Sequence, residues 1–149
     1  MHKSYEIIEH TADIGIRCRG SNLKELFKNA ALAMFDLIAE KPRVSFLQSF
    51  LNKVSPNKSE KIEVGVKGQD TEELFVNWLN ELLSSSAAEG LIFYDFVIER
   101  LDSNILEAIA IGGQFKEYRV NKEIKAATYH ELKVGQIKGA WQAEVIFDV

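Results

Sequence analysis

Two segments of the chain place apolar residues at steps of three and four, which is the pattern of a helix that buries one face. The first begins after Asn22 and the second after Asp70, and a glutamate follows each of these residues three positions later, at Glu25 and Glu73. This spacing is typical of a capping box, in which the two side chains satisfy main-chain amides that the first helical turn leaves without partners. We therefore predict two amphipathic helices, one over residues 22–38 and one from residue 70 into the serines at 84–86.

The rest of the chain alternates apolar and polar residues with a period of two, which is typical of half-buried strands. Short links between the closing strands favour antiparallel pairing, and no internal repeat is evident. We expect an α+β fold, with residues 1–149 forming a single compact two-layer domain in which two main helices pack on one face of a largely antiparallel sheet. Residues 40–60 hold both prolines and are expected to form an exposed excursion. The predicted strands cover residues 14–18, 62–66, 92–98, 105–111, 123–133 and 141–147.

The composition excludes several classes of protein. A hydrophobic fraction of 46% in 149 residues is enough for one buried core. The net charge of −4, from 18 Lys+Arg and 22 Asp+Glu, argues against a basic face that neutralises phosphates, so we expect any contact with RNA to be indirect. Cys18 is the only cysteine, which excludes an internal disulfide and a thiolate zinc cluster. With no apolar run near the roughly 18 residues that span a bilayer, a cytoplasmic location is expected.

The sequence lacks the familiar signatures of catalysis: a glycine-rich phosphate loop with its lysine, a His-Glu-x-x-His zinc motif and a nucleophile elbow. The three histidines lie far apart along the chain, and a hydrogen-bonded or surface role is the simpler interpretation of each. Cys18 has the inward phase of a small core residue, not of a catalytic thiol. Trp78 and Trp141 fall in phase with apolar stripes, which favours positions in the core.

Two aspartates stand beside the ends of predicted strands: Asp13 directly precedes the first of these strands, and Asp148 directly follows the last. If these strands pair antiparallel, the start of one lies beside the end of the other. Both aspartates have the phase opposite to the apolar residues, so both carboxylates would project away from the core. With the terminal carboxylate of Val149 they would form a cluster of anionic oxygens that a hard divalent cation neutralises, Ca²⁺ or Mg²⁺ in preference to Zn²⁺. The alternative is that Asp13 caps a turn and that Asp148 is simply solvated.

A second polar cluster follows residue 124. In a strand over residues 125–130, Thr128 and His130 share one face, while Tyr129 lies on the other. This face is either the exposed side of a strand or a small polar surface offered to a partner or substrate. Together with His10, which precedes Asp13, these two residues are the candidates for contacts to a partner or to the residues around a metal.

Five segments of the chain, in order, resemble the archease family. They include the run His10-Thr11-Ala12-Asp13 near the start and the last residues of the sequence, and together they extend over almost the whole chain. Each segment alone is a weak match, but five in the right order are specific. They are residues 10–16, 26–31, 74–83, 125–130 and 141–149.

The resemblance implies an activator whose partner performs the chemistry. Archease is the accessory protein of the RtcB-type RNA ligase of tRNA splicing and RNA repair, a metal-dependent enzyme that uses GTP to guanylylate its own active-site histidine. The family member promotes this guanylylation and sustains turnover. The resemblance also implies a metal site at Asp13, Asp148 and Val149, with Ca²⁺ as the expected ion and Mg²⁺ or Mn²⁺ as alternatives.

Two other classes of function remain as alternatives. One is a small metal-dependent phosphoester hydrolase, with His10 or His130 as general base beside a cation at Asp13. The other is a chaperone-like binding module, which would act on unrelated clients without a metal. The activator differs from the hydrolase because it has no turnover of its own.

Overall fold

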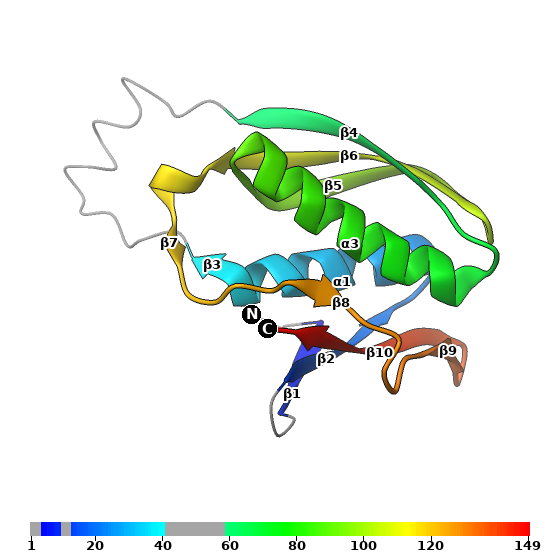
Figure 1. Cartoon of the computed structure of the whole chain (residues 1–149). Coiled ribbons are helices and arrows are strands. Elements are labelled where there is room, and N and C mark those ends of the chain that lie inside the picture. Colours follow the sequence, from blue (N-terminus) through cyan, green and yellow to red (C-terminus); the bar gives the residue numbers. More distant parts are fainter. Residues whose placement is uncertain (1–3, 10–12, 41–58) are drawn as a thin grey trace.

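Two helices lie between two antiparallel sheets in the computed structural model of the chain, which describes residues 4–9, 13–40 and 59–149 (Figure 1). The elements are β1 (Tyr5–Glu9), β2 (Ile14–Gly20), α1 (Leu23–Ile38), β3 (Ala39–Glu40), β4 (Glu60–Lys67), α3 (Thr71–Glu89), β5 (Leu91–Leu101), β6 (Ile105–Gln114), the 3₁₀ helix η1 (Phe115–Glu117), β7 (Arg119–Val120), β8 (Ala126–Ala127), β9 (Lys133–Ile137) and β10 (Ala140–Asp148).

One of the two sheets, here called the terminal sheet, contains the first and the last strands. Its order is β1-β2-β10-β8, and β9 also pairs with β10. The other, here called the central sheet, has the order β4-β6-β5, and the short strands β3 and β7 pair separately. All of these pairings are antiparallel.

The α+β class, the antiparallel strands and the two main helices are confirmed, but the strands divide into two sheets where the sequence pattern predicts one. The reason lies in α1, which is apolar on more than one side. Ala30, Ala31, Ala33 and Met34 are all fully buried, and residues so spaced cannot share one narrow stripe. The helix contacts β2 on one side and β5 on another, so it separates the two sheets.

Two predicted boundaries are wrong. The second helix continues through the serines to Glu89 and ends at Gly90, whose φ of 68° is the left-handed conformation that favours glycine. Ser86 is buried inside this helix, and its hydroxyl donates a hydrogen bond to the Leu91 carbonyl. Within the predicted strand over 123–133, only Ala126–Ala127 and Lys133 lie in strands, since the chain turns after β8 and begins β9 at Lys133. Most of the predicted excursion, residues 41–58, lies outside the described residues.

The strand, turn and helix from β2 to α1 have a close counterpart from β4 to α3. In each unit the cap accepts from the amide of the glutamate three positions later, over 2.9 Å at Asn22 and 2.8 Å at Asp70. The glutamate in turn accepts from the amide of the residue before the cap. Later in each helix an asparagine donates to a carbonyl at the end of the strand, over 2.7 Å from Asn29 and 2.8 Å from Asn77.

This match corrects the expectation that the chain holds no internal repeat. The shared pattern is a glycine at or just after the strand end, a cap two positions later, a glutamate three positions further and an asparagine four positions further. Both helices also carry Leu-Phe directly after the glutamate, while the strands and the later parts of the helices differ in sequence. The two units meet in the core, where the indole of Trp78 donates to the Phe27 carbonyl over 3.0 Å. The matching residues are Gly20, Asn22, Glu25, Leu26, Phe27 and Asn29 in the first unit and Gly68, Asp70, Glu73, Leu74, Phe75 and Asn77 in the second.

Candidate functional site

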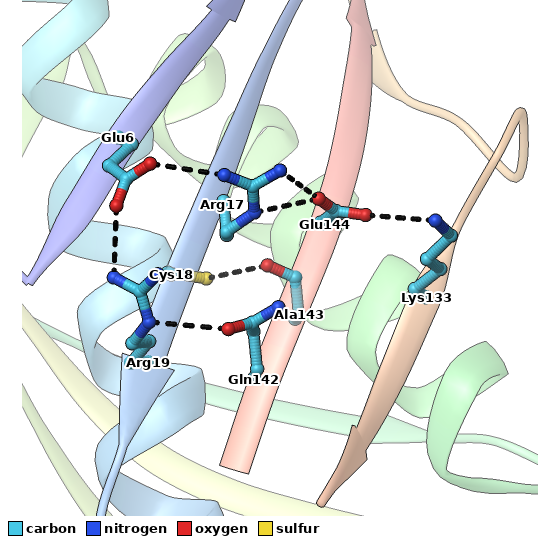
Figure 2. Close-up of polar contacts among 8 residues, drawn as sticks. All are labelled: Glu6, Arg17, Cys18, Arg19, Lys133, Gln142, Ala143 and Glu144. Atoms are coloured by element: carbon cyan, nitrogen blue, oxygen red, sulfur yellow. Dashed lines mark hydrogen bonds and ion pairs between the residues drawn. The ribbon is translucent and has the colours of Figure 1, made fainter. Parts of the chain in front are cut away.

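Polar side chains cross the face of the terminal sheet that points away from the helices (Figure 2). Arg17 on β2 donates through Nε to Glu144 on β10 over 2.7 Å and through a second nitrogen to Glu6 on β1 over 3.1 Å. On the same face, Arg19 donates to Gln142 over 3.2 Å and to Glu6 over 3.1 Å. The contacts to Glu144 and Gln142 link residues that the backbone register places opposite each other, so they support the alignment of β2 with β10. Glu6 lies opposite Arg17 and reaches Arg19 diagonally.

The same register brings the two predicted aspartates together. Ile14 pairs with Phe147 as the last residues of the ladder, so the next step along both strands sets Asp13 opposite Asp148. The antiparallel pairing on which the prediction depends is confirmed. Asp13 is partly buried and Asp148 is exposed, and both have the phase of the polar face. Val149, which follows, is 37% exposed.

The ligand atoms at this rim are oxygens, which is the type of ligand that a hard cation prefers. Two carboxylates directly opposite each other on neighbouring strands repel, and a divalent cation between them removes that repulsion. Carboxylate and main-chain oxygens are the ligands that Ca²⁺ and Mg²⁺ prefer. Among the described residues, no group of three or more histidine, cysteine, aspartate and glutamate side chains could hold a metal ion. Main-chain oxygens and water can complete the coordination of an ion held by two carboxylates.

The strand β8 flanks Asp148 on the side away from β2. The amide of Lys125 donates to the Asp148 carbonyl over 2.8 Å. Thr128 donates twice to the Ile146 carbonyl, from its amide over 3.0 Å and from its hydroxyl over 2.8 Å. His130 lies in the following turn, is exposed, and its amide points to the Thr128 hydroxyl at 3.3 Å. The predicted strand face shared by Thr128 and His130 is therefore absent, and His10 lies outside the described residues.

Sequence reasoning missed Asn80, which holds β8 from its other side. The Asn80 amide group accepts from the Ala127 amide over 2.8 Å and donates to the Ala127 carbonyl over 3.1 Å. Asparagine is a poor residue for the interior of a helix, because its side chain competes for main-chain partners. An asparagine in the middle of the second predicted helix was the sequence signal that could have indicated a specific contact at this position.

The remaining candidates belong to the core, as predicted. Cys18 is fully buried, and burial raises the pKa of its thiol to about 12, so it has no thiolate to act as a nucleophile near neutral pH. Its sulfur points to the Ala143 carbonyl (Figure 2). Trp78 is fully buried, while Trp141 is partly buried and packs against the core.

We expect Glu144 to contribute to the loss of stability of the protein at acidic pH. The hydrogen bond from Arg17 is the main cause that holds the pKa of Glu144 below its ordinary value. An unfolded glutamate has a pKa of about 4.3, so this stabilisation is present above that pH and is lost as the pH falls through the lower folded value. Glu144→Gln should therefore flatten the decline of the free energy of unfolding below about pH 4.3, as measured by urea unfolding.

The exposed Glu99 on β5 supplies the control for this experiment. Glu99→Gln should leave the pH dependence close to that of the unchanged protein. Equal slopes for the two variants would show that the Arg17 contact contributes nothing measurable.

No helix in the described part of the chain is long and apolar enough to cross a membrane. Comparison with known proteins then gives a consistent result over the full length. The model of the Archease protein family matches residues 5–149. The chain is 39% identical to the archease of Pyrococcus abyssi and 37% identical to that of Pyrococcus furiosus, each over 99% of both chains.

Two solved structures share the fold. Protein 1598 of Methanobacterium thermoautotrophicum aligns with a TM-score of 0.70 and 27% identity, over 99% of this chain and all of that one. An archease from Thermotoga maritima, described as a possible chaperone, aligns with a TM-score of 0.64 and 23% identity over the whole of both chains.

Proposed function

Because the chain belongs to the archease family, we propose that it is an accessory protein, not an enzyme, that activates an RtcB-type RNA ligase in tRNA splicing and RNA repair. In this role it promotes guanylylation of the ligase by GTP and sustains multiple turnover. The observation that carries the proposal beyond the family is the register of β2 with β10, which leads Asp13 and Asp148 to the same rim of the terminal sheet.

This rim would hold a divalent cation. The carboxylates of Asp13 and Asp148 and a main-chain oxygen of Val149 are the proposed ligands, with Ca²⁺ as the expected ion and Mg²⁺ or Mn²⁺ as alternatives. The bound ion would supply a positive charge that offsets the repulsion between the carboxylates. The residues themselves would hold the end of β10 against the start of β2, in one shape that a partner can recognise.

The charge of the protein favours a basic partner. The net charge of −4 opposes direct contact with phosphates. The surface of a ligase that handles RNA is expected to be basic, and opposite potentials steer two proteins together and fix their orientation. The chain would therefore reach RNA only through the ligase.

A time course of ligase guanylylation tests this proposal directly. We expect the protein to increase the rate of guanylylation by GTP. Treatment of the protein with a chelator, which removes divalent ions and is then neutralised, should abolish this increase. Return of Ca²⁺, Mg²⁺ or Mn²⁺ should restore it. The basal rate of the ligase at the same concentrations of free ions is the control, because the ligase is itself metal-dependent. An equal rate with and without the protein would refute the activator.

The two alternatives give different results. A hydrolase would cleave a phosphoester without the ligase and would lose this turnover on His130→Ala. A chaperone-like module would protect unrelated clients from aggregation, with or without a chelator.

A further inference from the structure

Strand β8 is too short to hold itself beside Asp148. It contains only Ala126 and Ala127, which pair with Asp148 and Phe147 of β10. On its other edge no strand of the described chain continues the terminal sheet. The side-chain amide of Asn80 takes that place, because it both accepts from and donates to the main chain of Ala127, as a neighbouring strand would.

Comparison of the two repeated units shows which asparagine contacts are common to both and which is found only at Asn80. Asn29 and Asn77 make the same contact in the two units, each to a carbonyl at the end of its strand. Asn80 stands three positions after Asn77, and the corresponding position after Asn29 is Leu32. The Asn80 contact therefore has no counterpart in the first unit and is not part of the shared strand–helix design.

Asn80 is connected to the proposed cation site through two sets of contacts, one to β8 and one from β8 to β10. Asn80 fixes Ala127, and the residues on either side of β8 bind β10, through the Lys125 amide on the Asp148 carbonyl and Thr128 on the Ile146 carbonyl. These bonds hold the last residues of β10 from the side opposite β2. A ligand held from both sides loses less conformational freedom when it binds an ion.

We infer that Asn80 is a positioning residue for the divalent-cation site, acting through β8 to hold Asp148 in the orientation that binds the ion. This inference rests on the cation site of the proposed function. Asn80 itself does not contact the ion. Its role is that of the outer residues that orient metal ligands, whose substitution typically weakens metal binding by about 10–100-fold.

Asn80→Leu removes both bonds at nearly constant side-chain size, and Asn77→Leu is the matched control on the same helix. Ca²⁺ affinity is measured by titration calorimetry on the full chain, at a temperature where circular dichroism shows every variant folded. Amide hydrogen exchange at Lys125, Ala127 and Thr128 reports whether β8 stays in place. If leucine prevents folding, Asn80→Ala provides the same test without added bulk.

We expect the Asn80 variant to bind Ca²⁺ about 10–100-fold more weakly and to exchange these three amides faster, while the Asn77 variant changes neither. Raising Ca²⁺ should restore full occupancy in the Asn80 variant. Unchanged affinity in that variant, beside clear binding by the unchanged protein, would overturn this inference alone. Failure of the unchanged protein to bind Ca²⁺, Mg²⁺ or Mn²⁺ would overturn the cation site and the inference with it.

Discussion

Asp13→Ala and Asp148→Ala are each expected to abolish activation of the ligase, so that the guanylylation rate falls to the basal rate of the ligase alone. Each substitution removes one of the two carboxylates that the β2–β10 register leads to the same rim. A Ca²⁺ site that loses a charged ligand loses much of its affinity. The measurement is the guanylylation rate at a fixed concentration of the variant, with full stimulation by either variant as the contradicting result.

The fold should survive both substitutions, which separates loss of function from unfolding. Asp148 is exposed, Asp13 is only partly buried, and neither belongs to the core, so thermal unfolding should change little. Asp95→Ala, which removes an aspartate of the central sheet that pairs with Lys28, should keep full activation. Because the two proposed ligands share one ion, the double variant should be no worse than either single variant.

The parts of this site that could be predicted from the sequence depend on local periodicity. Alternation around Ile14 and around Phe147 sets the phase of Asp13 and Asp148, and the ends of the strands set their place at a rim. Only the pairing of the strand after Asp13 with the last strand had to be assumed, and the register of β2 with β10 confirms it. The two helices could also be predicted from the sequence, because their caps and apolar stripes are local signals.

The parts that could not be predicted depend on partners distant in the chain. Alternation cannot show which strands share a sheet, so the division into two sheets was missed. Asn80 and Ala127 lie far apart in sequence and meet only in the folded chain, and the turn after Thr128 follows from contacts with β10. The repeat was missed for another reason: its continuous part, Glu-Leu-Phe-x-Asn at residues 25–29 and 73–77, is only five positions long, and the strands before it differ in sequence.

Gly68→Ala is expected to lower the free energy of unfolding by about 1–3 kcal/mol. A Cβ atom at Gly68 would lie 2.6 Å from the Leu74 nitrogen and 2.9 Å from the Leu74 Cα. Both are main-chain atoms in the first turn of α3, so the clash can be relieved only by moving the helix away from its strand. Such a movement would also strain the bond from Asn77 to the Lys67 carbonyl.

The repeat predicts a similar loss for Gly20→Ala, where the new Cβ would lie 2.4 Å from the Leu26 nitrogen in the first turn of α1. Gly135→Ala is the control, because no atom lies within 4 Å of a Cβ built there, and it should change stability by less than about 0.5 kcal/mol. Urea unfolding of the three variants gives the comparison. If Gly20→Ala and Gly68→Ala were as stable as Gly135→Ala, strand and helix would not need this close contact, and the two units would match in sequence without sharing a physical constraint.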